Sequence, residues 1–209
     1  MGANMTALHK AAAEAKVKFR PHTKVHMSAD IARAMVRAGA CGVEVGPIAQ
    51  AEAFADAGIL DILIAHPFVG PTKLEHLDRL LRRPNLKLSA CVDMYEQAEG
   101  ISQVAQRHNR KIPLLVKLET GINRYGVLPG NPALELAKTI RPLPGVEVAG
   151  VYAHEVGFEP TEAGILKGAL ETGTVVCDTT RLLRKENFHI DHVSVGASGT
   201  HFATCQLIK

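Results

Sequence analysis

Apolar runs alternate with segments of helical period along the whole chain. The run 59–67 has the nearly continuous apolar character of a strand in a parallel sheet that is covered on both faces. Seven strands are predicted, at 17–20, 42–46, 59–67, 86–93, 112–119, 146–154 and 192–196. Helices are predicted at 5–15, 28–38, 48–56, 72–81, 95–107, 132–140 and 165–183. This alternation predicts an α/β fold of parallel βα units.

Two layouts fit these units, an open doubly wound sheet and a (β/α)8 TIM barrel. Polar side chains suited to chemistry follow many strands instead of gathering at one point: Lys24, His66, Asp93, Glu119, His154 and Ser198. Strand ends form one ring in a barrel, so this distribution favours the barrel. The count stops at seven strands, and 204–209 supply no eighth. We therefore expect one incomplete, truncated barrel domain over 1–209, either a fragment or a chain completed by another.

Composition narrows the class of protein. The 209 residues are 46% apolar, and the net charge of +3 comes mostly from scattered basic residues, which indicates no nucleic-acid or membrane surface. The four cysteines are far apart in the sequence and form no C-x-x-C pair, as is usual for reduced thiols of a cytosolic protein. The first residues lack a signal-peptide pattern, and no apolar run approaches membrane-spanning length. The expectation is a soluble cytoplasmic protein.

The segment 18–26 ends a predicted strand in a turn that carries Lys24 between His22 and His26. A lysine at a strand end of a barrel is placed to act as a nucleophile or Schiff-base former. The alternative is an ordinary lysine that extends into solvent. His22 supports the first interpretation, because it shares a strand face with Lys24 if the strand period continues through the turn.

Two other stretches carry candidate chemistry. In 117–126 a strand delivers Glu119 and a glycine-containing turn follows with Arg124, which either is placed by the loop or simply pairs with Glu119 at the surface. The stretch 193–200 leads from the seventh strand into small residues with free backbone amides and two hydroxyls. Barrel enzymes often bind phosphate at that position.

These stretches resemble motifs of one family. Residues 20–26 resemble the Arg-Pro-His-x-Lys-Thr-His-Lys motif of the D-threonine aldolase and eukaryotic-type D-serine dehydratase family, fold-type III pyridoxal-phosphate enzymes with an alanine racemase-like first domain. Residues 117–126 resemble its Asp-Thr-Gly-x-x-Arg-x-Gly element, 151–154 its Tyr-Ala-His strand end, and 196–200 its phosphate loop. The matches arrive in family order and span nearly the whole chain.

The resemblance implies pyridoxal 5'-phosphate as the cofactor. Lys24 would form the internal aldimine and later act as the base at the substrate α-carbon, and Arg124 would lie near the phenolic oxygen of the ring. His154 would lie against the pyridine ring, and Tyr152 would line the site. The phosphate would be held by Gly196, Ser198, Gly199 and Thr200.

The implied activity is that of a D-amino-acid lyase, either a D-threonine (β-hydroxy-D-amino acid) aldolase or a D-serine dehydratase. The full-length family uses a divalent metal (Mn, Mg or Zn) bound in a C-terminal β domain, and that domain and the eighth strand are absent from these residues. Full-length members are homodimers. For this chain alone we expect weak or no turnover and a monomer or a non-native association.

The chain also departs from the family pattern. Glu119 replaces the Asp of the second element, Met27 replaces the second Lys of the first motif, and 155–159 differs from the usual continuation after the histidine. One alternative is a non-catalytic pyridoxal-phosphate homeostasis barrel, and another is a barrel that binds a phosphorylated metabolite without this cofactor. A metal site from His192 and His201 lacks a recognisable ligand spacing, so core or polar roles are favoured for both histidines.

Overall fold

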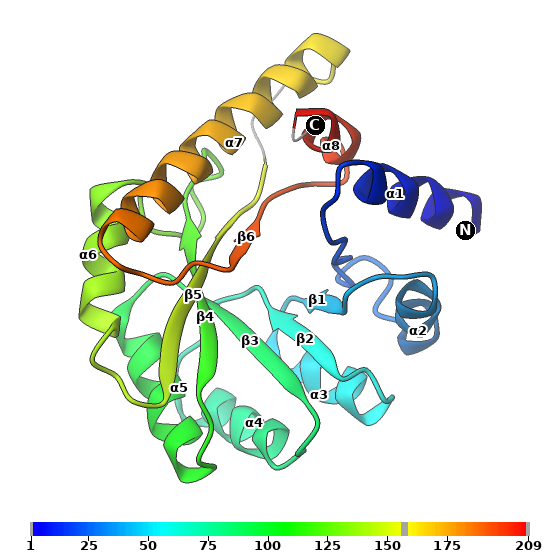
Figure 1. Ribbon diagram of the computed structural model, residues 1–209. Helices are drawn as coiled ribbons and strands as arrows, with labels where there is room; N and C mark the ends of the chain where they lie inside the picture. Colours follow the sequence, from blue (N-terminus) through cyan, green and yellow to red (C-terminus); the bar gives the residue numbers. More distant parts are fainter. Residues whose placement is uncertain (1, 156–158, 208–209) are drawn as a thin grey trace.

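The computed structural model describes residues 2–155 and 159–207, and within them six parallel strands form one curved sheet in sequence order (Figure 1). The strands are β1 (Val43–Val45), β2 (Asp61–Ile64), β3 (Lys87–Val92), β4 (Ile112–Leu118), β5 (Val146–Ala153) and β6 (His192–Ser194). Neighbours in the sheet follow each other along the chain, and each pair is parallel. This is the topology of a partial (β/α)8 barrel, so the predicted fold class is confirmed.

Helices α3 to α7 follow the outer side of the sheet, and α1, α2 and α8 lie toward its open side (Figure 1). The helices are α1 (Gly2–Glu14), α2 (Ala29–Arg37), α3 (Ile48–Asp56), α4 (Pro71–Leu81), α5 (Tyr95–Arg107), α6 (Asn131–Ile140), α7 (Glu162–Lys185) and α8 (His201–Leu207). Among the described residues, no helix combines the length and apolar character needed to cross a membrane.

The predicted first strand at 17–20 is wrong as a sheet strand, although the segment lies where that strand belongs. Its link to β1 is a single bridge between His22 and Glu44, flanked by hydrogen bonds from Glu44 N–H to the Pro21 carbonyl (2.8 Å) and from Thr23 N–H to the Glu44 carbonyl (2.8 Å). Pro21 has no N–H to donate, which limits a longer ladder. The described part of the chain therefore holds six strands instead of seven.

Alternation along the strands separates two apolar layers. The larger layer lies between the sheet and its helices and includes Ile62, Ile64, Leu114, Val116 and Val151. The smaller layer fills the concave inner side with Leu63, Ala65, Cys91, Leu115 and Tyr152. A strand places successive side chains on opposite faces, so Glu44 and Lys117 share the inner side with this second layer.

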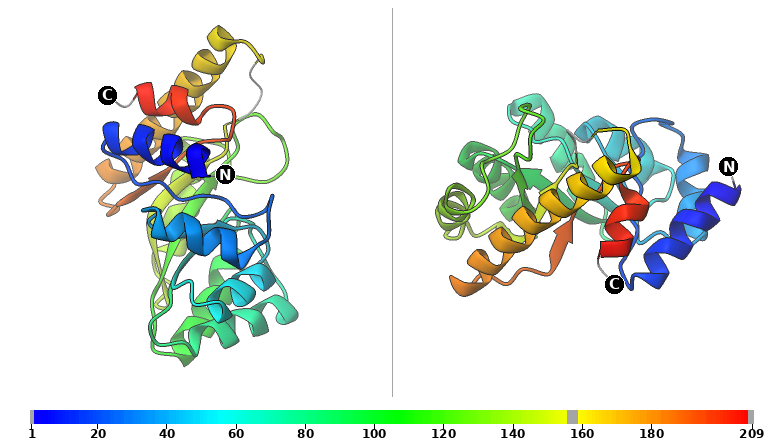
Figure 2. Two further views of the ribbon diagram at one scale, coloured as in Figure 1. Left: turned by 90° about the vertical axis from the view of Figure 1, so that its right-hand side faces the viewer. Right: turned by 90° about the horizontal axis from the view of Figure 1, so that it is seen from above.

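The first and last helices that the structure describes pack against each other, as both views in Figure 2 show. The Phe19 ring lies between His9 and His201, with ring centroids 5.1 Å away in each case. His201 Nε2 is 3.2 Å from the Leu8 carbonyl oxygen. The sequence analysis assigned no element to 201–207, which forms α8 in the structure.

Candidate functional site

The Lys24 turn is held by its neighbours and leaves its own side chain exposed. Thr23 is fully buried, and its hydroxyl donates to the Glu44 carbonyl at 2.9 Å. The carbonyl of Thr23 accepts the Met27 N–H at 2.9 Å, and the backbone N–H of Lys24 donates to His22 Nδ1 at 3.2 Å. The backbone of the turn is thus fixed while the amine of Lys24 reaches solvent.

Basic side chains gather at the carboxyl ends of the strands. They are His22, Lys24, His66, Lys117, Arg124 and His154. Burial lowers the pKa of all three histidines, and that of His22 falls to about 3. Nearby cations act in the same direction, while the hydrogen bond to the Gly196 carbonyl partly opposes the shift at His154. The imidazoles are therefore neutral at pH 7, and the positive charge comes from the two lysines and the arginine. An anionic ligand would complement this end of the sheet.

Several buried polar side chains lie beneath this cluster of basic residues. The Tyr152 hydroxyl donates to Glu44 Oε1 at 2.5 Å, and His22 Nε2 is 3.5 Å from the same oxygen. The Lys117 ammonium lies 3.8 Å from the Tyr152 ring centroid and 4.9 Å from that of Tyr125. Burial raises the pKa of Glu44 and lowers that of Lys117.

The sequence analysis did not assign a site role to Glu44 or Lys117. Each is a charged residue flanked by apolar residues in a short strand, at an inward position of the alternation. Burying a charge costs free energy, so a charged residue in a strand that is covered on both faces indicates a specific role. This pattern could have identified both residues from the sequence.

The loop after β4 places Arg124 by backbone contacts. The Glu119 carboxylate accepts N–H groups of Gly121 (2.5 Å), Asn123 (2.9 Å) and Arg124 (3.4 Å). Burial works in the opposite direction, but these donors outweigh it and lower the pKa of Glu119. The guanidinium carbon of Arg124 lies 4.4 Å from the Tyr125 ring centroid. Glu119 therefore shapes the loop through backbone bonds instead of simply pairing with the arginine side chain.

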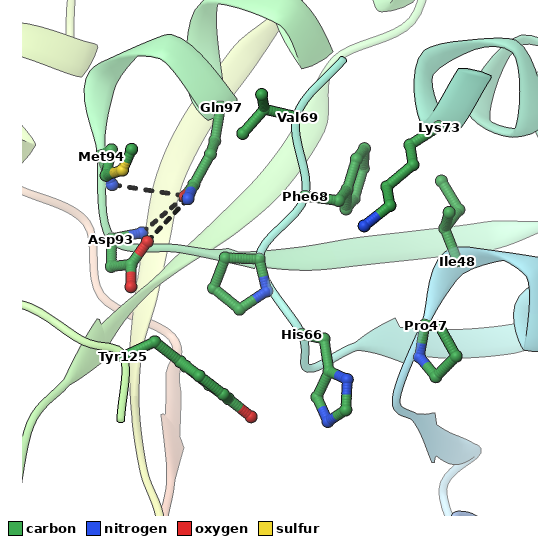
Figure 3. Close-up of a pocket in the computed structure, with 11 residues that line it drawn as sticks. Pro47, Ile48, His66, Phe68, Val69, Lys73, Asp93, Met94, Gln97 and Tyr125 are labelled. Atoms are coloured by element: carbon green, nitrogen blue, oxygen red, sulfur yellow. Dashed lines mark hydrogen bonds between the residues drawn. The ribbon is translucent and has the colours of Figure 1, made fainter. Parts of the chain in front are cut away.

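A pocket of about 450 Å³ lies beside the basic cluster at the ends of β1, β2 and β3 (Figure 3). Its lining combines polar His66, Lys73, Asp93, Gln97 and Tyr125 with apolar Pro47, Ile48, Pro67, Phe68, Val69 and Met94. Asp93 is engaged in structural bonds, since its two oxygens accept the Gln97 amide and the Gly126 N–H, each at 2.7 Å. His66 belongs to both the pocket and the basic cluster, and its ring centroid lies 5.8 Å from that of Tyr125.

The loop 196–200 is held to the end of β5. The Gly196 carbonyl accepts the Glu155 N–H at 3.5 Å and lies 3.2 Å from His154 Nδ1. A carbonyl can only accept, so Nδ1 of His154 carries the proton. The φ of Gly196 is +141°, and a Cβ placed there would meet open space. His154 and the loop are therefore neighbours.

Within that loop the structure separates Thr200 from Ser198 and Gly199. The Thr200 side chain is fully buried, and its hydroxyl donates to the Glu155 carboxylate while accepting the Ala197 N–H at 3.0 Å. Ser198 and Gly199 are exposed. The expected hydroxyl contact from Thr200 to a phosphate does not fit this geometry, because its hydroxyl is directed into the protein. Thr200 instead shapes the loop.

Two points from the family resemblance concern a metal site and the segment after His154. Among residues 2–155 and 159–207, no group of three or more His, Cys, Asp or Glu side chains is arranged to hold a metal ion. The departure from the family pattern after His154 falls largely on 156–158, which lie outside the described residues.

Comparison with known proteins identifies the family of this chain. The model of the alanine racemase N-terminal domain matches residues 1–206. The chain belongs to this family. This alanine racemase N-terminal domain is 32% identical to a D-threonine aldolase of an Arthrobacter species over 200 residues, which are 95% of the chain and 52% of the aldolase. It is 26% identical to a 3-hydroxy-D-aspartate aldolase of Paracoccus denitrificans over 89% of the chain and 49% of that protein.

Solved structures agree with this assignment of the alanine racemase N-terminal domain. The D-threonine aldolase from Filomicrobium marinum superposes with a TM-score of 0.87 at 30% identity, covering 97% of this chain and 55% of the aldolase. The D-threo-3-hydroxyaspartate dehydratase from Delftia sp. HT23 gives a TM-score of 0.84 at 26% identity, over 96% of this chain and 53% of that structure. The chain thus spans about half the length of these relatives.

Proposed function

We propose that this domain is the pyridoxal-phosphate-binding half of a lyase that acts on small β-hydroxy-D-amino acids, as a D-threonine aldolase or a D-serine dehydratase does. The relatives named D-threonine aldolase and 3-hydroxy-D-aspartate aldolase support this class of activity. The observation that carries the proposal is the exposed Lys24 side chain in the turn after the His22–Glu44 bridge, beside a cluster of cations. A primary amine binds an aldehyde, and the cations attract an anion.

The residues present carry donor groups of the kinds that bind this cofactor. When bound, the cofactor withdraws electrons from the substrate α-carbon. Lys24 Nζ would hold it, and the same nitrogen would accept a proton at the substrate α-carbon. Arg124 supplies positive charge near the ring, and His154 presents a ring oriented by the Gly196 carbonyl.

The remaining site residues take supporting roles in the proposal. Gly196, Ser198 and Gly199 bind the phosphate through backbone amides and the exposed hydroxyl of Ser198. Thr200 braces that loop from below through Glu155. Tyr152 lines the base of the site, where it is 6% exposed and bonded to Glu44.

Cofactor binding is tested by adding pyridoxal phosphate to the purified chain and following the visible absorption band of lysine-bound cofactor. Reduction with borohydride and mass spectrometry then identifies the modified lysine. We expect modification of Lys24 and its loss in Lys24→Ala. Lys18→Ala is the matched control, since Lys18 is an exposed lysine of the same segment. A band that persists unchanged in Lys24→Ala refutes the assignment.

Activity is tested with D-threonine and D-serine, with and without Mn²⁺ or Mg²⁺. The divalent metal, the homodimer and the cytoplasmic location remain predictions for the full-length protein. We expect weak or no turnover for the 209-residue chain and turnover for a longer protein that includes the second domain. If the longer protein binds the cofactor but shows no lyase activity, the non-catalytic homeostasis barrel is the better description.

A further inference from the structure

Three side chains and one backbone N–H, each within 3.5 Å of the next, form a continuous polar path from β5 to the Lys24 turn. Tyr152 Oη lies 2.5 Å from Glu44 Oε1, and the same oxygen lies 3.5 Å from His22 Nε2. On the other side of the imidazole, His22 Nδ1 lies 3.2 Å from the backbone nitrogen of Lys24. The path thus joins two segments that are more than 100 positions apart in the sequence.

The donor and the acceptor at each contact follow from whether each group carries a hydrogen, a lone pair or both. The backbone N–H of Lys24 can only donate, so His22 Nδ1 accepts and carries no proton. A neutral imidazole then holds its proton on Nε2, which faces Glu44. The Tyr152 hydroxyl donates to that same carboxyl oxygen. Glu44 Oε1 is therefore the common acceptor for β5 and for the turn.

The Lys24 turn is held in place mainly by hydrogen bonds. The turn exposes 85% of Val25 and 72% of Met27, so apolar packing contributes little to its position. Its remaining anchors on the β1 side are also on Glu44, whose carbonyl accepts both the N–H and the hydroxyl of Thr23. One buried residue thus holds the turn through its backbone and, by way of His22, through its side chain.

We propose that Glu44 is a positioning residue for Lys24, whose carboxyl oxygen fixes the Lys24 backbone through the His22 imidazole and is itself fixed by Tyr152. The inference rests on the proposed function only in taking Lys24 as the cofactor lysine. Glu44 itself touches neither cofactor nor substrate, because its residue is 6% exposed beneath the basic cluster.

The first experiment needs neither a variant nor the cofactor. Nitrogen-15 NMR of the histidine rings in the wild-type chain reports which nitrogen of His22 carries the proton. We expect the Nε2–H form at pH 7, persisting into acidic solution because burial lowers the pKa of His22 to about 3. The charged or titratable groups that face His22 are Lys24 on its own segment, Glu44 on β1, His66 after β2, Lys117 on β4 and His154 after β5. An Nδ1–H form of His22 overturns the proposal.

The second experiment measures how fast pyridoxal phosphate attaches to Lys24, using borohydride trapping. Glu44→Leu removes the carboxyl oxygen, and we expect attachment to slow by roughly tenfold, the factor for leaving one buried donor without its acceptor. Glu44→Gln keeps an oxygen in the same place and should stay within about twofold of wild type. Glu147→Gln, an exposed glutamate at the far end of β5, is the matched control and should not change the rate.

Each outcome decides the proposal. Loss in Glu44→Leu with rescue by Glu44→Gln supports positioning through the acceptor oxygen. An unchanged rate in Glu44→Leu, or an equal loss in both variants, overturns it. If Glu44→Leu fails to fold, the wild-type NMR result decides alone. If the wild-type chain does not react with the cofactor at all, the proposed function fails while the ring NMR still tests the link from Glu44 to the turn.

Discussion

The contact between Thr200 and Glu155 gives the sharpest quantitative prediction. Thr200→Val keeps the shape of a fully buried side chain but removes the hydroxyl that donates to the Glu155 carboxylate. It also removes the acceptor of the Ala197 N–H, whose nitrogen lies 3.0 Å from the Thr200 hydroxyl oxygen in the wild-type chain. Thr204 still donates to the carboxylate, with distances of 3.0 and 2.9 Å to its two oxygens. The substitution therefore isolates one buried hydroxyl.

The expected cost follows from these bonds. A hydrogen bond to an ionised group contributes about 1.5–3 kcal/mol and a neutral backbone bond about 1 kcal/mol. With partial compensation by Thr204, we expect Thr200→Val to lower the free energy of unfolding by about 2–3 kcal/mol at pH 7. For a chain of this size that corresponds to a fall in Tm of roughly 5–10 °C.

The cost should depend on pH in a defined direction. Burial raises the pKa of Glu155, although the hydroxyls of Thr200 and Thr204 act against it. The folded chain thus binds this proton more tightly than the unfolded chain does, and stability falls as pH rises above the unfolded value of about 4.3. Removing the Thr200 hydroxyl raises the folded pKa further. As the pH rises, the variant should therefore lose more stability than the wild type does. Below pH 4 the difference in the free energy of unfolding between the two should shrink to about 1 kcal/mol.

Urea unfolding at pH 7 and pH 4, followed by circular dichroism, measures both values. Thr174→Val is the control, because Thr174 is an exposed threonine on α7 whose hydroxyl bonds only to its own helix in the described contacts. A deficit below about 0.5 kcal/mol at pH 7, the usual range for surface changes, would refute the reasoning. An equal deficit at both pH values would refute its electrostatic part.

Three further predictions concern other parts of the fold. Gly126→Ala should destabilise the chain by at least about 2 kcal/mol in urea unfolding, because φ is +131° and the new Cβ would lie 2.7 Å from the Glu119 nitrogen. Ser28→Ala removes the side-chain cap of α2 and should cost about 0.5–1 kcal/mol by the same measurement, whereas an unchanged midpoint would show that the cap contributes nothing. A thiol reagent should label exposed Cys177 rapidly and Cys91 only on unfolding, since burial raises the pKa of the Cys91 thiol; equal labelling rates in the folded chain contradict this.

The fold was predictable from the sequence wherever the hydrophobic period was long and its ends were marked. The helix 95–107 and the helix 48–56 were predicted with their observed bounds. The segment 17–20 was read as a strand from its residue types, but ladder formation depends on a partner and on N–H groups that Pro21 lacks. Helix α8 is too short for a periodic signal and is supported by tertiary contacts with α1.

The site was predictable in part, for a related reason. Lys24, Arg124 and His154 each follow a strand, and parallel strands bring such positions to one end of the sheet. The buried partners were missed because their role depends on side chains from distant segments. Nothing near Glu44 in the sequence points to Tyr152, and nothing near Thr200 points to Glu155. Short-range motifs located the exposed half of the site, and only the folded chain reveals what supports it.

The packing of α1 against α8 also bears on how the chain folds during synthesis. The contact between His201 and the Leu8 carbonyl closes a span of 193 positions, and α1 buries only Ala12 among its own residues. Of the elements described, α1 leaves the ribosome first, yet it acquires this partner only when α8 has emerged. A nascent chain must therefore carry α1 undocked from α8, with the side of the Phe19 ring that contacts His201 uncovered, until 201–207 have been synthesised.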